Sequence, residues 1–496
     1  MGSKLKLAGA LAVGVVAGAL ATTQLQAIAQ GVPHLQLRQF ADVFALIKTD
    51  YVEPVSDSKL IDNAISGMVS GLDPHSQYFD AKSFKEFREA TQGRFVGVGI
   101  EISMEDGLVK VVSPIEGSPA FKAGLKPGDL ITRIDDTVVK GLTLDQAVKR
   151  MRGEPKTRVA LSIYRKSENR SFTVTVVRDT IRVQSVRGRI VQPGYAWIRI
   201  SQFQDQTVAD FTRKAQELVQ QSPGLKGLVL DLRNDPGGLL DGAVAISAAF
   251  LPPKSVVVTT NGQIAESKAS YAADPKDYAG RGPDPLAGIP EVLKTVPVVV
   301  LVNEGTASAS EIVSGALQDY KRATIMGSQT FGKGSVQTVR QLSADTAVKF
   351  TTALYYTPKG RSIQAQGIIP DVKVDDSLEG SQFAALRLRE ADLDKHLQGK
   401  NEVVDPAREA AREAARKKLE AQMESGAKPP EPPPEYGSDK DFQLQQALNF
   451  LQGKPVVTSK TQVERPPQKK DDDGATPAPD AKKPAAPPAA APATKP

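Results

Sequence analysis

The chain has no cysteine among its 496 residues, and this absence excludes several classes of site. A thiol nucleophile, a zinc–thiolate centre and a disulfide are all ruled out. Attachment as a lipoprotein, which needs a lipidated cysteine, is ruled out as well. An exported protein without cysteine avoids oxidative mispairing, which suits a periplasm.

Histidine and aromatic residues are also scarce. The only histidines are His34, His75 and His396, there is one tryptophan, and aromatic residues make up 5% of the chain. Without a basic patch interleaved with aromatic residues, the sequence does not predict nucleic-acid binding. The net charge of +6 comes from 63 basic and 57 acidic residues, so the surface is mixed and the charge serves solubility.

The N-terminus carries a targeting pattern. Lys4 and Lys6 precede an apolar stretch from Leu7 to Leu20, and Ala27-Ile28-Ala29 follows. This pattern predicts a signal peptide over residues 1–29 and a periplasmic location. The alternative is an uncleaved anchor in the inner membrane, although the stretch is short for a span, which needs about 20 apolar residues.

The C-terminal end differs in composition from the rest. Residues 429–436 are proline-rich, and the sequence beyond Gln468 is built from Lys, Asp, Pro and Ala. Such sequence buries too little apolar surface to offset its ordering entropy. We therefore expect a disordered tail over 456–496, preceded by a C-terminal helical extension over 376–455.

Residues 30–92 show helical periodicity. Apolar residues recur from Phe40 to Ile47 and from Leu60 to Val69, Asp57-Ser58 is a candidate cap, and Gly71 a stop. This predicts a small N-terminal helical region. It is either a dimerisation or docking element, or a helical layer packed on the main body.

Residues 93–180 change to short alternating strands with glycine turns. Strands are expected around Ile100, Leu108–Val112, Val159–Tyr164 and Phe172–Val177, with a helix over Leu142–Met151. The order of elements and the Ala-Gly-Leu-x-Pro-Gly-Asp segment ending at Asp129 resemble a PDZ domain, a small β-sandwich that captures peptide C-termini.

A peptide site follows from that resemblance. The backbone N–H groups of Gly97, Val98, Gly99 and Ile100 can bind a carboxylate, and the peptide would add as a strand facing the helix around Val148. The alternative is a β-sandwich with glycine turns and no ligand.

Residues 181–375 alternate strands and helices. Nearly all-apolar runs at Gly227–Leu232 and Val296–Val302 read as buried strands, and Thr207–Val219, Asp241–Phe250 and Ala309–Tyr320 read as helices. This pattern predicts a layered α/β core. Ser270–Leu286 is polar and rich in Gly and Pro, so we expect a surface loop there.

Ser308 lies where a buried strand turns into a helix. The helix N-terminus places free N–H groups and partial positive charge beside its hydroxyl, which favours an oxyanion, and the N–H of Ala309 is a natural donor. A second donor is expected from Gly237 or Gly238, after the strand that ends at Asp231. The alternative for Ser308 is a simple capping serine.

Lys333 lies between two glycines in Phe331-Gly-Lys-Gly334. An exposed lysine, with a pKa of about 10.4, is a poor base at neutral pH, but burial favours its neutral form. A neutral amine can accept the proton of a serine hydroxyl. Gln337, four residues on, would face the same way in a strand and orient the lysine. The alternative is a surface lysine in a glycine loop.

Together these segments resemble the carboxyl-terminal processing protease family, the tail-specific serine peptidases. The matching segments are Asp231-Leu-Arg-x-x-Pro-Gly-Gly238, Ser308-Ala-Ser-Glu311, Phe331-Gly-Lys-Gly334, Arg361-Ser-Ile-Gln364 and Gly367-Ile-x-Pro-Asp371. The resemblance implies a multidomain α/β protein: an N-terminal helical region, a PDZ-like β-sandwich, a layered peptidase core of the crotonase or Clp-protease type, and a tail.

The resemblance also implies roles for individual residues. Ser308 corresponds to the nucleophile, with Ser310 as its rival, Lys333 to the general base and Gln337 to a supporting residue. Arg152 lies where relatives have an arginine that couples peptide occupancy to the active site. The implied activity is a serine endopeptidase with a Ser–Lys dyad, which needs no cofactor and no metal.

The implied substrates are exported polypeptides with apolar C-termini. An adaptor lipoprotein and a second copy of the chain, joined through the N-terminal helices, are candidate partners. Two other functions stay open. One is a catalytically silent PDZ adaptor, and the other is a different acyl-transfer enzyme on a related core.

Overall fold

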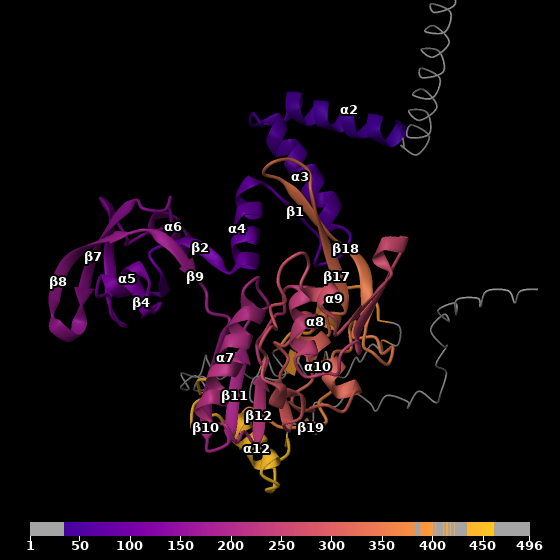
Figure 1. Ribbon diagram of the computed structural model, residues 1–496. Coiled ribbons are helices and arrows are strands. Elements are labelled where there is room, and N and C mark those ends of the chain that lie inside the picture. Colours follow the sequence, from indigo (N-terminus) through magenta and orange to yellow (C-terminus); the bar gives the residue numbers. More distant parts are fainter. Residues whose placement is uncertain are drawn as a thin grey trace, which may run out of the picture.

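The computed structural model describes residues 34–381, 387–399 and 434–460, together with isolated positions between 402 and 421. An N-terminal helical arm, a small β domain and an α/β core follow one another along the chain (Figure 1). The multidomain α/β prediction is confirmed. The predicted signal peptide and residues 461–496 of the predicted tail lie outside the described residues.

The arm begins with two helices. Ser56, rather than Asp57 or Ser58, is the N-cap of the second helix, because its side chain accepts a hydrogen bond from the N–H of Lys59. The short strand that follows joins the core, where it pairs with β18 (Ala347–Tyr356). The elements are α2 (His34–Asp50), α3 (Asp57–Ser70), β1 (Gln77–Phe79) and α4 (Ala81–Gln92).

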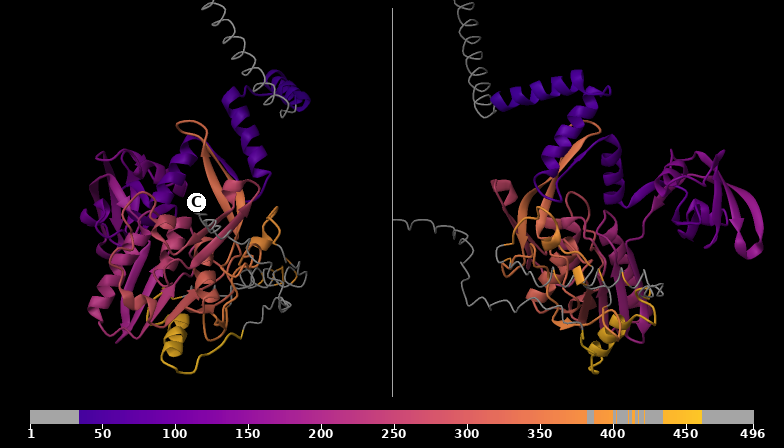
Figure 2. Two further views of the ribbon diagram at one scale, coloured as in Figure 1. Left: turned by 45° about the vertical axis from the view of Figure 1, so that its right-hand side comes forward. Right: turned by 180° about the vertical axis from the view of Figure 1, so that it is seen from behind.

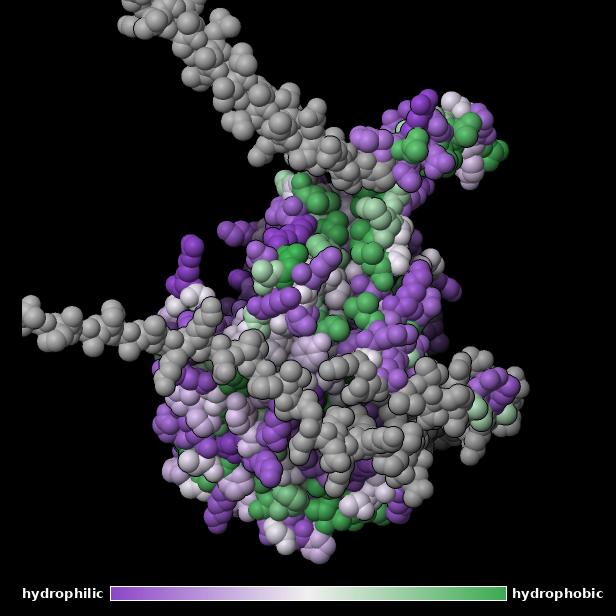
Figure 3. All heavy atoms as spheres, turned by 90° about the vertical axis from the view of Figure 1, so that its right-hand side faces the viewer, coloured by the Kyte–Doolittle hydropathy of each residue, from purple (hydrophilic) through white to green (hydrophobic). Residues whose placement is uncertain are grey.

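Helix α2 has no buried residue, so it does not form a packing layer on the body. Its apolar side chains face solvent: Leu35 is 78% exposed, and Met68 of α3 is 69% exposed. Figure 3 shows hydrophobic residues gathered along this arm. Exposure of this kind suits a docking or dimerisation element, which stays a prediction. No described helix is both long and apolar enough to cross a membrane.

The β domain has the expected order of strands and helices. Its sheet runs β3-β4-β5-β7-β8, and β6 pairs with β5. The buried Asp129 of the glycine-rich marker segment binds Arg165 through two hydrogen bonds of 2.7 and 2.8 Å. The elements are β3 (Ile100–Glu105), β4 (Leu108–Pro114), α5 (Pro119–Lys122), β5 (Leu130–Ile134), β6 (Thr137–Val138), α6 (Leu144–Met151), β7 (Arg158–Arg165), η1 (Lys166–Glu168) and β8 (Arg170–Val177).

A two-stranded ribbon connects this domain to the rest of the chain. Strand β2 (Arg94–Gly97) enters the domain from α4, and β9 (Asp179–Arg182) leaves it, in antiparallel register. The domain lies to one side of the core, attached through this ribbon, in Figure 1 and in the right-hand view of Figure 2.

The core contains a six-stranded sheet in the order β10-β11-β12-β15-β16-β19, parallel from β11 onward. Alternate residues of its strands face opposite sides: Leu228 and Leu230 pack in the cluster with α7, α8 and α10, whereas Val229 packs with α12. The elements are β10 (Val186–Gln192), β11 (Tyr195–Ile200), α7 (Thr207–Gln221), β12 (Gly227–Asp231), α8 (Leu240–Ala248), β15 (Val298–Val302), α10 (Ala309–Asp319), β16 (Thr324–Gly327), β19 (Val372–Lys373) and α12 (Phe442–Leu451).

A second sheet has the order β1-β18-β13-β14, with β17 also paired to β18. The prediction of a plain surface loop over Ser270–Leu286 was wrong. That segment contributes a strand to this sheet and a short helix, and its Ala273 and Leu286 are buried. The remaining elements are β13 (Val256–Gly262), η2 (Ala265–Ser267), β14 (Ala269–Ala272), α9 (Pro275–Tyr278), η3 (Glu291–Lys294), β17 (Ser335–Gln341), β18 (Ala347–Tyr356) and η5 (Glu390–Asp392).

The described part of the C-terminal region packs on the core. Asp441, the N-cap of α12, accepts two hydrogen bonds from the buried Arg233, at 2.6 and 2.9 Å. Farther along, the N–H of Ser459 donates to the carbonyl of Lys373. The chain is therefore still bound to the core at the start of the predicted tail.

Candidate active site

Ser308 follows β15 and is the N-cap of α10, as the sequence predicts, but its backbone is unusual. Its φ is +56° and its ψ is −115°, whereas an ordinary N-cap serine is extended. A non-glycine residue held there costs on the order of 1–3 kcal/mol, and such residues gather at functional sites. A capping role alone does not account for this conformation.

The Gly-Gly turn after β12 lies directly against Ser308. A Cβ at Gly237, whose φ is +90°, would lie 2.6 Å from the carbonyl oxygen of Ala307 and 2.7 Å from the N of Ala309. Gly238 is held on its other side, because Phe203 and the residues flanking Gly238 pair through two hydrogen bonds of 2.9 and 3.0 Å. Only glycine fits this approach, so the structure brings the two segments together.

The two proposed second donors of the oxyanion hole are not equivalent. The N–H of Gly237 already donates to Oδ1 of Asp235 at 2.8 Å. Within the described residues, the N–H groups of Gly238 and Ala309 donate no hydrogen bond. Ala309 and Gly238 are therefore the better candidate pair.

Ser310, the rival nucleophile, is fully buried, and its hydroxyl donates to the carbonyl of Asp235 at 3.2 Å. A hydroxyl without access to a substrate cannot attack it. Asp235 itself is buried as well, and burial raises the pKa of its carboxyl to about 8. A protonated Asp235 suits a site where Oδ1 accepts one N–H and Oδ2 has no partner among the described residues.

Glu311 was not singled out for a role from the sequence, yet its fully buried carboxylate joins both catalytic segments. Oε2 accepts from the N–H of Ser308 at 2.8 Å and from the N–H of Lys333 at 2.9 Å. Oε1 accepts from the N–H of Gly332 at 2.8 Å and the hydroxyl of Thr330 at 2.5 Å. Burial raises the pKa of Glu311 to about 7, although these four donors stabilise its charged form.

Lys333 lies in the loop just before β17 and is partly buried. Burial lowers the pKa of its ammonium group, and the neighbouring positive charge of Lys349 lowers it further. Both effects favour the neutral amine that a general base needs. Within the described residues no hydrogen bond joins the Ser308 hydroxyl to the Lys333 amine, so the dyad stays a prediction.

Tyr355 contacts the backbone carbonyls of both Ser308 and Lys333. Its fully buried hydroxyl lies 3.0 Å from the carbonyl oxygen of Ser308 and in contact with the carbonyl oxygen of Lys333. A phenol has one proton and donates to one carbonyl at a time. Burial raises the pKa of Tyr355, so the hydroxyl stays protonated.

Gln337 is placed differently from the sequence argument. Lys333 lies outside β17, and a bulge between Val336 and Gln337 breaks the alternation of side chains. The Gln337 amide donates to the hydroxyls of Ser335 and Thr351, at 3.0 and 3.2 Å. Its role beside Lys333 stays a prediction.

A second buried carboxylate, Glu390, supports the lysine loop. Its carboxylate lies 2.8 Å from Nε2 of His75 and accepts a hydrogen bond from the side-chain amide of Gln364 at 2.9 Å. The side-chain oxygen of Gln364 in turn accepts from the N–H of Gly334 at 2.9 Å. His75 belongs to the N-terminal region, 315 positions before Glu390. No local sequence motif can predict a contact between residues so far apart in the chain.

The peptide groove at Gly97–Ile100 stays a prediction, and the structure gives the backbone hydrogen bonds of this segment. The carbonyls of Val98 and Gly99 accept from Ala120 and Ile115, at 2.9 and 3.0 Å, while their N–H groups donate no hydrogen bond within the described residues. Strand β3, which begins at Ile100, pairs with β4 along one edge, and no described strand pairs with its other edge. Val148 lies on α6, partly buried.

Arg152 ends α6 and points to the helical arm. Its guanidinium donates to the carboxylate of Glu89 on α4 at 2.8 Å, and it lies over the Phe95 ring at 5.3 Å. This hydrogen bond joins the β domain to α4, and the predicted link of Arg152 to the active site stays a prediction. Among the described residues, no group of three acidic, histidine or cysteine side chains could hold a metal ion.

Comparison with known proteins adds to this geometry. Residues 194–374 match "Peptidase family S41", 96–176 match "PDZ domain" and 16–83 match "Activating protease CtpB N-terminal domain". A carboxy-terminal-processing protease of Bartonella bacilliformis is 42% identical over 397 residues, 78% of this chain and 88% of that protein.

Two further relatives are more distant. A probable CtpA-like serine protease of Staphylococcus aureus is 38% identical, over 68% of this chain and 65% of that protein. A solved structure, the photosystem II D1 C-terminal processing protease, is 30% identical over 74% of this chain and 92% of that chain, with a TM-score of 0.39.

Proposed function

Because this chain belongs to peptidase family S41, the carboxy-terminal-processing serine peptidases, and carries a PDZ domain, we propose that Ser308 is its nucleophile and Lys333 its general base. The observation that carries this assignment is the Glu311 carboxylate, whose single oxygen Oε2 binds the N–H groups of both residues. Because the N–H groups of Ser308 and Lys333 donate to the same oxygen atom, their backbone segments lie close together.

The reaction runs through an acyl-enzyme. Neutral Lys333 takes the proton of the Ser308 hydroxyl as its oxygen bonds to the substrate carbonyl carbon, and the N–H groups of Ala309 and Gly238 bind the oxyanion. The C–N bond then breaks, and the Lys333 ammonium returns the proton to the leaving amine. A water molecule deprotonated by Lys333 attacks the ester, and the proton goes back to Ser308.

Substrate choice is the task of the PDZ domain. An apolar polypeptide C-terminus would bind its carboxylate at the N–H groups of Gly97–Ile100 and add as a strand to the unpaired edge of β3, facing Val148. We also propose that the chain is exported to the periplasm. Its exposed helical arm would then bind a second copy or an adaptor lipoprotein.

Cleavage of unfolded polypeptides by the purified chain tests the dyad. Ser308→Ala and Lys333→Ala should each abolish cleavage, and Lys333→Arg should do the same, because arginine stays charged. Ser310→Ala is the matched control and should keep activity. A substrate fragment bound as an ester should be found on Ser308 by mass spectrometry.

Equal cleavage by the wild type and the Ser308 and Lys333 variants would refute the dyad. Binding of the polypeptide without any cleavage by the wild type would support the silent adaptor instead. Ester formation on Ser308 with small acyl donors, but not with polypeptides, would support another acyl-transfer enzyme.

Competition tests the PDZ assignment. A free peptide with an apolar C-terminus should change the cleavage rate of a tailed substrate, whereas the same peptide with an amidated C-terminus should not, because it lacks the carboxylate. Identical effects of the two peptides would show that the PDZ domain does not recognise the C-terminal carboxylate.

A further inference from the structure

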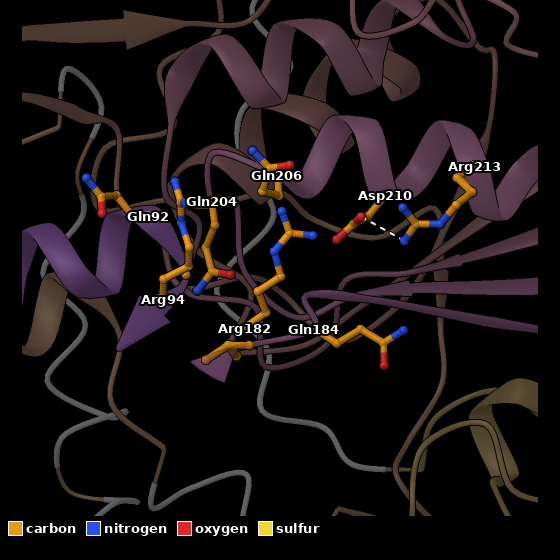
Figure 4. A pocket seen from close by; sticks show the side chains of 10 residues that line it. Gln92, Arg94, Arg182, Gln184, Gln204, Gln206, Asp210 and Arg213 are labelled. Carbon is orange, nitrogen blue, oxygen red and sulfur yellow. Dashed lines mark hydrogen bonds and ion pairs between the residues drawn. The ribbon is translucent and has the colours of Figure 1, made fainter. Parts of the chain in front are cut away.

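A hollow of about 140 Å³, which Ser308 does not line, lies where the ribbon of the β domain meets the start of α7 (Figure 4). Gln92 and Gly93 at the end of α4, the ends of β2 and β9, and the start of α7 line it. Ligand pockets for drug-sized molecules are typically about 300–1,000 Å³. This hollow suits a smaller ligand.

The lining carries more positive than negative charge. Arg94, Arg182 and Arg213 face one acidic residue, Asp210, and Asp210 is already paired with Arg213 at 2.8 Å. Within the described residues no carboxylate pairs with Arg94 or Arg182. Among the residues that the structure describes, these two guanidinium charges therefore have no acidic counter-charge.

The two unpaired arginines are also set directly opposite each other. Arg94 of β2 and Arg182 of β9 are register partners, so both side chains stand on the same face of the ribbon. Figure 4 shows both side chains extending towards the start of α7. Like charges directly opposite each other destabilise a strand pair, unless an anion lies between them.

One donor of this pair is buried without an acceptor. Nε of Arg94 is shielded from solvent and has no hydrogen-bond partner in the described part of the chain. Leaving a buried charged donor unpaired is costly, so such groups normally have a partner. Gln184 and Gln206 add amide donors to the same lining, and Gln206 is the N-cap of α7 but makes no side-chain cap.

We propose that this hollow binds a phosphate-sized oxyanion through Arg94 and Arg182. Guanidinium groups bind phosphate oxygens in pairs with matched geometry, and two of them supply the charge that a dianion needs. The site is distinct from the proposed catalytic residues and does not depend on their roles. The shared chemistry is that of inorganic phosphate and of a phosphoglycerol headgroup.

The position of the hollow gives the anion a structural consequence. Gln204 lines it, donates to the carbonyl of Ala90 on α4 at 3.3 Å, and directly follows Phe203, which holds the Gly237–Gly238 turn. A bound anion joins both strands of the ribbon to α7 of the core. Binding should therefore restrain the ribbon on which the PDZ domain is mounted.

Calorimetric titration of the full chain with inorganic phosphate tests the proposal. The double variant R94Q/R182Q should bind phosphate at least tenfold more weakly than the wild type. The control is Arg187→Gln, an exposed arginine of β10 outside the hollow, which should bind as the wild type does. Equal weakening by R187Q, or no phosphate binding by the wild type, would overturn the site.

Thermal unfolding separates lost binding from lost folding. Phosphate should raise the Tm of the wild type and leave that of R94Q/R182Q unchanged, because only a native site links binding to stability. Without phosphate the double variant should be at least as stable as the wild type, since it removes the repulsion between two like charges. A lower Tm without phosphate would contradict the argument from repulsion.

Titration with glycerol 3-phosphate distinguishes the sources of the anion. Equal binding of both compounds in the wild type, lost in R94Q/R182Q, assigns the site to free oxyanions. Binding of glycerol 3-phosphate at least tenfold tighter than that of phosphate, with both lost in the same variant, assigns it to a headgroup. Binding of either compound that survives in R94Q/R182Q would refute the proposal.

Discussion

The Ser308 and Lys333 segments are held together by a buried carboxylate, whereas the PDZ domain is mounted on a two-stranded ribbon and one partly exposed ion pair. Glu311 accepts four hydrogen bonds, and hydrogen bonds to a charged group contribute roughly 1.5–3 kcal/mol each. The Arg152–Glu89 pair, with side chains 41% and 19% exposed, belongs to a class that contributes about 0–1 kcal/mol.

The segments proposed for catalysis are therefore held more firmly than the domain proposed for substrate recognition. The backbone around Ser308 is strained, and strain persists only where the surroundings over-determine it, as the Glu311 carboxylate, the Tyr355 hydroxyl and the Gly237 turn do here. The attachment of the PDZ domain has no comparable network among the described residues. Changes to the first region should therefore cost far more than changes to the second.

Among changes that leave Ser308 and Lys333 in place, the largest effect is expected from Glu311→Gln. An amide offers one acceptor oxygen where the carboxylate offers two, so an NH₂ group would face N–H donors of Ser308, Gly332 or Lys333. A displacement of about 1 Å in a catalytic group can cost on the order of 10²-fold. We expect a fall in kcat of that size with little change in KM, measured on a tailed polypeptide.

Glu291→Gln, an exposed residue of η3, is the matched control for this change and should leave kcat unaltered. If Glu311→Gln lowered stability and left kcat of the folded fraction intact, Glu311 would be structural only. That result would remove the central element of the comparison.

A smaller but still large effect is expected from Gly237→Ala. The added Cβ would meet the carbonyl oxygen of Ala307 at 2.6 Å, at a φ of +90°. Gly360→Ala is the control, because it has a φ of +78° but open space around its Cβ position. Both variants carry backbone strain of roughly 1–2 kcal/mol, and only the first pushes on the active site.

We expect kcat to fall more than tenfold in Gly237→Ala and less than twofold in Gly360→Ala, with a lower Tm in both. Steady-state kinetics and thermal unfolding measure the two effects. Similar kcat values in the two variants would mean that the close approach of the turn to Ser308 does not matter for catalysis.

Elements with a strong local signal could be predicted from the sequence. The continuous apolar run before Asp231 and the small-residue turn at Ser308 identified β12, β15 and the start of α10, because buried parallel strands need such runs. The prediction over Ser270–Leu286 was wrong because local polarity hid the pairing of β14 with β13, which tertiary contacts decide.

The support of the site could not be predicted in the same way. Glu311 occupies the third helical position after Ser308, where a capping glutamate is ordinary, and nothing local shows that it also binds the N–H of Lys333, 22 residues on. The contact of His75 with Glu390 spans 315 positions. Such contacts depend on the folded chain, whereas motifs report only on their own segment.

The pH dependence of kcat tests how the protonation of Glu311 and Lys333 affects the catalytic region. Because burial raises the pKa of Glu311 to about 7, the group is protonated below that pH and loses an acceptor that its N–H donors need. Lys333 acts in the same direction, since lower pH charges the base, although its lowered pKa moves that loss to lower pH.

We therefore expect kcat to fall about tenfold between pH 8 and pH 6, whereas affinity for a C-terminal peptide, measured on Ser308→Ala, should stay nearly constant. Stability linkage has its own sign: the raised pKa of Glu311 means that the native state binds the extra proton, so its contribution to stability falls as pH rises through this window. A kcat independent of pH from 6 to 8 would contradict the assignment of both groups.

The smallest effect is expected from Arg152→Gln. The residue binds Glu89 rather than any described residue of the active site, so its loss should change kcat for an untailed polypeptide less than twofold. A double-mutant cycle with Glu89→Gln should give a coupling of about 0.2–1 kcal/mol in thermal unfolding, the range of exposed pairs. If Arg152→Gln instead lowered kcat as far as Glu311→Gln does, the arginine would reach the active site in a second arrangement of the PDZ domain.

The ribbon of β2 and β9 would then act as a hinge. Movement of the loosely mounted PDZ domain against the fixed catalytic region would in that case control the activity of the enzyme.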